Sequence, residues 1–187
     1  MATRRTGLKQ HPTMRLTLPV HHDTVRGMDF PRLPNPEQEA GRRGAETLTA
    51  ERGGCVPWCG PAVIALASGC SYADACTLLH EVAPTRYTPG EEVVTAYWRD
   101  VVAALGRAGV KAAARSVEGR PTLLAMARPG RLESGLYLVR VTGHFLLLRL
   151  HGFGLAQVHD NRLSGAVLSR RTHGLCRVTH LARLTGG

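Results

Sequence analysis

The order of patterns along the chain predicts an α+β fold, with helices first and an antiparallel sheet after them. A short apolar helix is expected at 59–68, and an apolar period of three and four residues runs through 91–108. From residue 136 onward, short apolar runs alternate with glycine-bearing turns, which is typical of strands. A chain of 187 residues is long enough to bury one sizeable core.

Residues 1–53 lack this regularity. Prolines recur from Pro12 to Pro36, and no apolar period is sustained. Such a segment cannot build its own core, so we expect an extended arm or linker at 1–53 and one domain at 54–187. An arm of this kind is typical of a segment that lies across an assembly partner.

The helical half has clear start and stop signals. Pro61 suits the first turn of the helix at 59–68, and Gly69 supplies its left-handed end. Ser71 and Asp74 form a capping box for a second helix that runs to about Val82. A longer helix is expected over 91–108, with an apolar stripe of Val94, Tyr97, Trp98, Val101, Val102 and Leu105.

The second half changes to a β pattern after a strand at 110–117 and a short helix at 121–127 that begins with Pro121. Strands are expected at 136–141, 144–150, 155–160 and 165–169. Residues 175–184 fit a helix and a strand equally well.

Composition narrows the classes of function. The net charge of +10 is carried mainly by dispersed arginines with few aromatic residues, which argues against sequence-specific nucleic-acid binding. No apolar run approaches the ~20 residues of a membrane helix, and no signal peptide opens the chain. Five cysteines, an odd number, favour reduced thiols. We therefore expect a cytoplasmic or virion-associated protein without membrane contact.

Cys59 is the candidate nucleophile. It opens a helix whose unpaired N–H groups and positive dipole end favour a thiolate. The alternatives are a buried packing cysteine, or a redox pair with Cys55. Cys55 is the second candidate nucleophile, but Val56 and Pro57 follow it and predict extended chain.

His144 is the candidate general base, because it opens a strand and leads into a run of leucines. Burial alone would keep its imidazole neutral. Asp160 and Asn161 compete to orient it. A regular hairpin that pairs Leu150 with Leu155 would bring Asn161 opposite His144, whereas a loop one residue longer would favour Asp160.

The order of these segments, Cys59-Gly60-Pro61-Ala62, then Gly143-His144, then Val158-His159-Asp160-Asn161, resembles the papain-like cysteine peptidases. Among them it is most similar to the small C39-like domains of bacteria and phages, over roughly residues 54–184. The resemblance implies helices packed on a sheet, a Cys59–His144–Asp160 catalytic triad, a protein or peptide substrate, and no cofactor.

The chain departs from this family where a glutamine usually precedes the cysteine as an oxyanion donor. Gly53 and Gly54 occupy that region, so the candidate donors are the Cys59 backbone N–H and the Trp58 indole. The sequence therefore leaves two functions open. One is a cysteine peptidase or amidohydrolase; the other is a weak or inactive papain-like module that serves as a structural component of a phage particle or another large assembly.

The segment from His173 to His180, with Cys176 between them, contains residue types that bind metals. No second cluster completes a set of four ligands, so we expect no metal site there.

Overall fold

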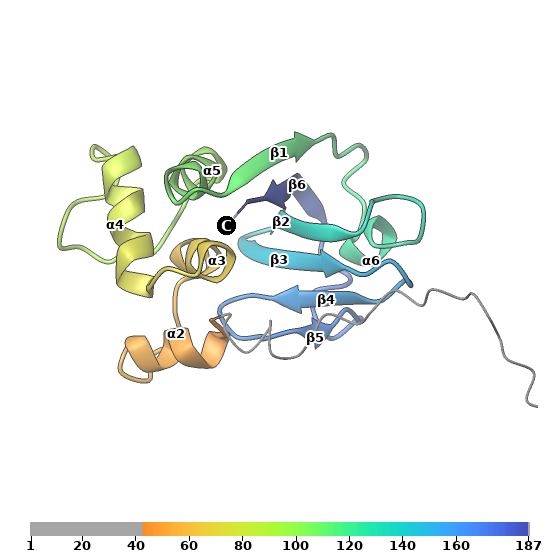
Figure 1. The fold of residues 1–187 in the computed structure, drawn as a ribbon, viewed down its shortest axis with the longest axis horizontal. Coiled ribbons are helices and arrows are strands. Elements are labelled where there is room, and N and C mark those ends of the chain that lie inside the picture. Colours follow the sequence, from red (N-terminus) through yellow and green to blue (C-terminus); the bar gives the residue numbers. More distant parts are fainter. Residues whose placement is uncertain (1–42, 187) are drawn as a thin grey trace, which may run out of the picture. The chain divides into compact units, whose positions relative to one another are not determined.

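A computed structural model describes residues 43–186 and shows an α+β fold (Figure 1). Its helices are α2 (Ala45–Glu51), α3 (Cys59–Ser68), α4 (Tyr72–Val82), α5 (Trp98–Arg107) and α6 (Leu123–Met126). Its strands are β1 (Lys111–Arg115), β2 (Gly135–Val141), β3 (His144–Leu150), β4 (Ala156–His159), β5 (Ala166–Val167) and β6 (Val178–Thr185).

The strands form one sheet in the order β1-β6-β2-β3-β4-β5, and every neighbouring pair is antiparallel. The expected helical first half and β second half are confirmed. The ambiguous residues 175–184 are resolved in favour of a strand, because β6 pairs with β2 on one side and with β1 on the other.

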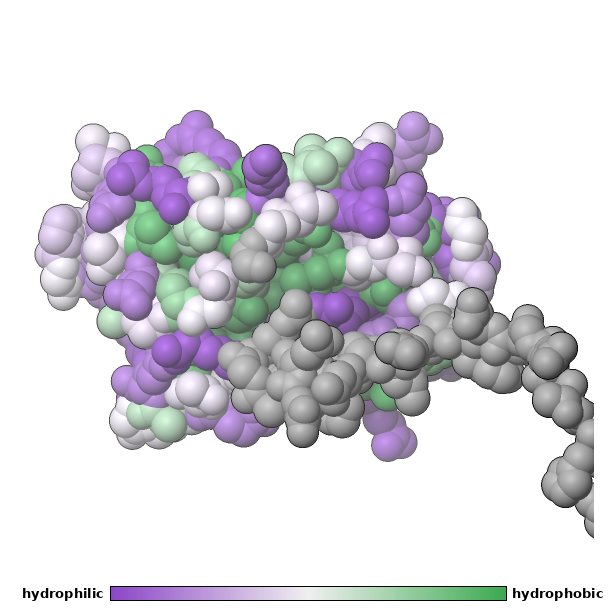
Figure 2. All heavy atoms as spheres, viewed as in Figure 1, coloured by the Kyte–Doolittle hydropathy of each residue, from purple (hydrophilic) through white to green (hydrophobic). Residues whose placement is uncertain are grey.

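Both faces of the sheet are covered. Phe145 and Leu147 of β3 belong to a core that includes buried residues of α3, α4 and α5. Leu146 and Leu148 point the other way, into a second core with Leu123 of α6. A run of consecutive leucines in β3 is therefore buried on alternate faces. Figure 2 shows one outer surface of this arrangement, where apolar side chains gather between the helices and the strands and hydrophilic residues surround them.

The predicted helix signals are confirmed for α3 and α4. Gly69 ends α3 with a φ of 79°, in the left-handed region that favours glycine. Before α4, the Ser71 hydroxyl accepts a hydrogen bond from the Asp74 N–H, and the Asp74 carboxylate accepts one from the Ser71 N–H. These two caps fix the sharp change of direction between the helices.

The predicted helix at 91–108 is shorter than expected, because residues before Trp98 are extended or irregular. Val94 and Tyr97 belong to the predicted apolar stripe, yet both side chains are about half exposed. The reason is tertiary packing. A Cβ atom on Gly60 would lie 2.3 Å from the Ala96 Cβ, so this segment passes directly over the first turn of α3 instead of coiling.

The predicted boundary at residue 53 also differs from the structure. Helix α2 lies within the segment assigned to the arm, and its Leu48 is fully buried in the core that contains α3. Seven residues are too few for an apolar period to be visible in the sequence. Residues 1–42 lie outside the described part of the chain, and so does most of the expected arm.

A smaller correction concerns α6. The helix begins at Leu123, not at Pro121, and Thr122 is its N-cap, because the Thr122 hydroxyl accepts a hydrogen bond from the Ala125 N–H.

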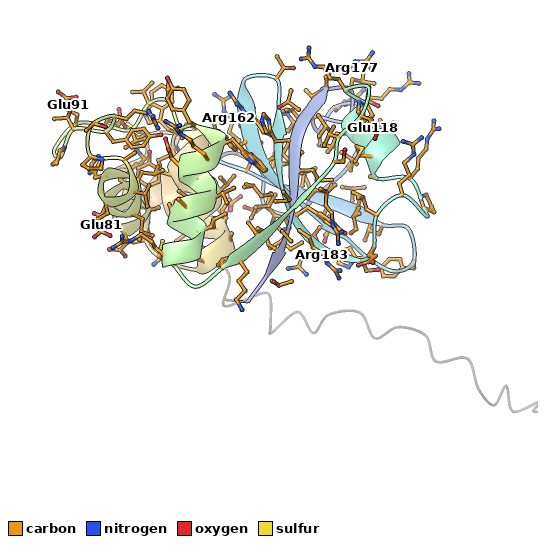
Figure 3. The ribbon with its side chains drawn as sticks, turned by 90° about the horizontal axis from the view of Figure 1, so that it is seen from above. Glu81, Glu91, Glu118, Arg162, Arg177 and Arg183 are labelled. Atoms are coloured by element: carbon orange, nitrogen blue, oxygen red, sulfur yellow. The ribbon has the colours of Figure 1, made fainter. Side chains whose placement is uncertain are left out.

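Within the described residues, no single helix has the length and apolarity to cross a membrane. Helices α3 and α4 taken together reach that length and composition, with a bend of 109° between them. Figure 3 shows the molecule from above. Glu81 and Glu91 lie on the helical side, and Glu118, Arg177 and Arg183 lie on the side of the sheet.

Candidate active site

Three chain segments meet at the end of the sheet beside α3. Strand β3 begins at this end and β4 finishes at the same end (Figure 1). His144 is the first residue of β3, Asp160 directly follows β4, and Cys59 is the first residue of α3. The sequence therefore placed these three residues correctly at the starts and ends of their elements.

The loop between β3 and β4 decides which residue contacts His144. Leu150 pairs with Ala156, not with Leu155, so the connection is one residue longer than a regular hairpin would give. This is the condition that favours Asp160 over Asn161. The Nε2 atom of His144 lies 2.9 Å from Oδ2 of Asp160. Asn161 instead donates a hydrogen bond from Nδ2 to the Pro57 carbonyl at 2.6 Å, two residues before Cys59.

Asp160 is almost completely buried, with 1% of its surface exposed. Its Oδ1 atom accepts hydrogen bonds from the backbone N–H groups of Arg162 and Leu163, at 2.7 and 2.8 Å. Burial raises the pKa of Asp160, but the hydrogen bond with His144, the backbone N–H donors and the charge of His144 outweigh it and lower the pKa to about 2. Asp160 is therefore a carboxylate, which can only accept hydrogen bonds.

Because Asp160 only accepts, Nε2 of His144 must carry the proton in this contact. The other ring nitrogen, Nδ1, is left for Cys59. Burial lowers the pKa of His144, but hydrogen bonds with Asp160 and with Cys59 outweigh it, and the pKa rises to about 9. This corrects the expectation of a neutral imidazole, which considered burial without its partners.

Cys59 is partly buried and interacts with His144. Burial raises the pKa of its thiol, yet the hydrogen bonds with His144 and with the Phe145 backbone bring the pKa below its ordinary value. Trp58, the residue before the helix, makes no side-chain cap, and Cys59 is the first helical residue, where the positive end of the helix dipole favours a negative charge. This arrangement stabilises a thiolate beside an imidazolium.

The other cysteine candidates have different surroundings. Cys55 is exposed, as expected for the extended stretch that precedes α3. Burial raises the pKa of Cys76, which makes it less reactive at neutral pH. The structure shows all five cysteines as free thiols, so Cys55 and Cys59 are not joined by a disulfide.

Sequence reasoning missed His173. Its Nε2 atom lies 2.7 Å from the same Asp160 oxygen that His144 contacts, and its ring stacks on His144 with centroids 4.9 Å apart. In the sequence, the only signal of the segment around His173 is its metal-binding residue types. A loop between two strands offers no periodic signal that would direct a side chain to a particular partner, so spacing could not have found this contact.

Among the described residues, His144, Asp160 and His173 form a group that could hold a metal ion. Their ligand atoms all lie within 4.8 Å of one another. Both Nε2 atoms already face one carboxylate oxygen, so a metal would have to replace both hydrogen-bonded protons. The hydrogen-bonded arrangement accounts for the geometry without a metal.

Exposed apolar side chains surround the start of α3. Val56 and Trp58 precede Cys59, and Val94 and Tyr97 flank the Ala96 that packs on Gly60. A separate cavity of about 170 Å³ is lined by Leu66 near the other end of α3, together with Arg149 and His159. His159 accepts a hydrogen bond from the Gly165 N–H, away from Asp160, as the alternation along β4 predicts.

No protein-family model, curated protein or solved structure matches this chain. The resemblance to papain-like peptidases therefore stays a prediction from the motifs.

Proposed function

We propose that the protein is a cysteine peptidase or amidohydrolase that acts by acyl transfer through Cys59. One observation carries the proposal: Nε2 of His144 lies 2.9 Å from the buried Asp160 carboxylate, and the same imidazole interacts with the Cys59 thiol and lowers its pKa. A nucleophile, a base and a group that fixes the base are what thiol-based amide hydrolysis requires.

In the proposed reaction, the Cys59 thiolate attacks the carbonyl carbon of an amide, and a C–S bond forms as the carbonyl oxygen becomes an oxyanion. His144 gives its Nδ1 proton to the leaving nitrogen as the C–N bond breaks. A water molecule then attacks the thioester while His144 takes its proton, and the acid and the thiolate are released. Asp160 accepts from Nε2 throughout and stabilises the imidazolium.

The surroundings of Cys59 favour an apolar peptide substrate. Trp58 and Tyr97 are exposed by 38% and 49%; Trp58 directly precedes Cys59, and Tyr97 follows Ala96, which packs on Gly60. Exposed large apolar side chains beside a reactive group are typical of binding surfaces. The Cys59 N–H and the Trp58 indole are the proposed oxyanion donors.

The test is alkylation by iodoacetamide at pH 6, followed by mapping of the modified cysteine. Cys59 should react first. An ordinary thiol, with a pKa near 8.5, is only about 0.3% thiolate at this pH. His144→Ala should therefore slow the labelling of Cys59 by roughly 100-fold, whereas His159→Ala should leave it unchanged. Fluorogenic peptide amides with apolar residues then test for turnover.

Faster labelling of Cys55 or Cys76 than of Cys59 would contradict the proposal, and so would an unchanged rate in His144→Ala. Cys55 serves as an internal reference because it is exposed.

The alternative is a papain-like module with little or no activity that acts as a structural component of a phage particle or another assembly. One observation favours it. Gln157 is the sole glutamine among residues 43–186, and it is engaged elsewhere, with His151 and with the Gly165 carbonyl. A reactive Cys59 that hydrolyses none of the amides tested would support this alternative.

A further inference from the structure

The Asp160 carboxylate receives two imidazoles on one oxygen. Its Oδ2 atom lies 2.9 Å from Nε2 of His144 and 2.7 Å from Nε2 of His173. Because the ionised carboxylate can only accept, both Nε2 atoms must carry protons. His144 and His173 therefore compete for the same acceptor charge, and the shorter contact belongs to His173.

His173 is held in place firmly. Its backbone φ of 63° lies in the left-handed region, which is costly for a residue with a side chain. The next residue, Gly174, accepts a hydrogen bond from the Leu124 N–H of α6 and donates one to the Ser169 carbonyl. A Cβ on Gly174 would lie 2.3 Å from the Ser169 oxygen, so the loop is packed tightly at this point.

The ring of His173 also covers one face of His144, with an angle of 26° between the ring planes. The side chains that interact with His144 thus come from three elements: Cys59 from α3, Asp160 from the end of β4, and His173 from the loop before β6. Of these three, only His173 has no part in the proposed proton transfers.

We propose that His173 is a positioning residue: its N–H shares the Asp160 oxygen with the N–H of His144, and its ring holds the His144 ring by stacking. The inference rests on the thiolate–imidazolium pair of the proposed function. Sharing one oxygen between two donors leaves less negative charge for each.

Three variants of the full chain separate the two contributions. His173→Phe keeps a ring but removes the N–H donor, so Asp160 serves His144 alone, and the titration midpoint of His144 should rise by roughly one pH unit. His173→Gln keeps a donor without a ring and should restore the midpoint toward wild type. His173→Ala removes both, and alkylation of Cys59 at pH 6 should slow by roughly tenfold as the His144 ring loses its orientation.

Two measurements report these effects: ¹⁵N NMR of the His144 ring across pH, and the pH profile of Cys59 alkylation. His151→Phe is the matched control, because His151 also stacks on an aromatic ring and contacts one side chain, Gln157, at the other end of β3. It should change neither readout. A cooperative unfolding transition in urea, measured for His173→Phe and for His173→Gln, confirms that both variants fold.

The outcomes distinguish the two proposals. If wild-type Cys59 titrates as an ordinary thiol, the proposed function fails. If wild-type Cys59 is reactive but His173→Phe leaves the His144 midpoint unchanged or lowers it, only the role of His173 is overturned. Stoichiometric zinc in the purified protein, with a pH profile that changes on chelation, would also overturn it, because the three groups would then be metal ligands.

Discussion

Two carboxylates in the described part of the chain are buried, and their partners differ in kind. Asp100, 6% exposed, accepts a hydrogen bond from the Tyr87 hydroxyl at 2.8 Å and is paired with Arg86. Asp160, 1% exposed, is paired with two imidazoles and two backbone N–H groups. A guanidinium stays charged at every accessible pH, whereas an imidazole gains and loses its proton near neutrality.

The difference shows that burial of a carboxylate does not by itself mark a reactive site. The Asp100 network ties the extended segment before α5 to the helix, because the Tyr87 hydroxyl also accepts a hydrogen bond from the Tyr97 N–H. Its partners keep their protonation states, so its role is structural. The partners of Asp160 can move protons, and one of them reaches a thiol.

The largest expected contrast is in thiol reactivity. Asp160→Asn removes the charge that stabilises the His144 imidazolium, so alkylation of Cys59 at pH 6 should slow by about 30- to 100-fold. Asp100→Asn should leave this rate unchanged. Equal slowing in both variants would mean that the effect comes from general loosening of the fold.

Asp100 should contribute to the stability of the fold. Asp100→Ala leaves the Tyr87 hydroxyl without its buried acceptor and should lower the free energy of unfolding by about 2 kcal/mol. Urea denaturation measures this loss. Glu91→Ala, an exposed acidic residue in a nearby loop, is the control and should stay within about 0.5 kcal/mol of wild type. A loss no greater than that of Glu91→Ala would refute a structural role for Asp100.

The contributions of the Asp160 site and of the Asp100 network to stability should also differ in their dependence on pH. The pKa of His144 is raised from 6.5 to about 9, so its contribution to stability is complete below pH 6.5 and is lost as the pH rises through about 9. The pKa of Asp160 is lowered from 3.8 to about 2, so its contribution is present above pH 4 and is lost as the pH falls through about 2.

The stability difference between wild type and His144→Gln should therefore shrink between pH 6.5 and 9. The difference between wild type and Asp100→Asn should stay constant over that range, because Arg86 remains charged and the raised pKa of Tyr87 keeps its hydroxyl protonated. Denaturation at several pH values tests both. A constant difference for His144→Gln would contradict its raised pKa.

The smallest effect is expected from Asn161, which contacts the chain before α3 and not His144. Asn161→Ala removes the hydrogen bond to the Pro57 carbonyl and should cost about 1 kcal/mol of stability. Alkylation of Cys59 should slow only two- to threefold. A loss as large as that of Asp160→Asn would reassign Asn161 as the residue that orients His144.

Much of this arrangement was readable from the sequence, because it depends on local signals. Gly69 and the pair of Ser71 and Asp74 marked helix ends through backbone chemistry within four residues, and the structure has both. Cys59 and His144 were recognisable because each opens an element. Asp160 and Asn161 could not be separated, since a change of one residue in loop length exchanges the two.

The features that could not be predicted from the sequence depend on contacts between distant segments. The segment before Trp98 has helical spacing, but the first turn of α3, where Gly60 has no side chain, gives it a packing surface in an extended form. His173 reaches Asp160 through a loop fastened to α6, and no pattern in its own neighbourhood encodes that. Tertiary packing outweighs local preference at both places.

The position of β6 has a consequence for the order of folding. It pairs with β1 on one side and β2 on the other, so β1 joins the sheet only when a strand distant in sequence inserts between them. Helix α3 packs directly on β3, but a long stretch of chain separates the two elements. The meander β2-β3-β4 closes through short loops and can assemble early, whereas the long closures are slower. His144 and Asp160 belong to the early part and Cys59 to the late part. The reactive sulfur thus acquires its partner near the end of folding, and its labelling rate at pH 6 can time that last step.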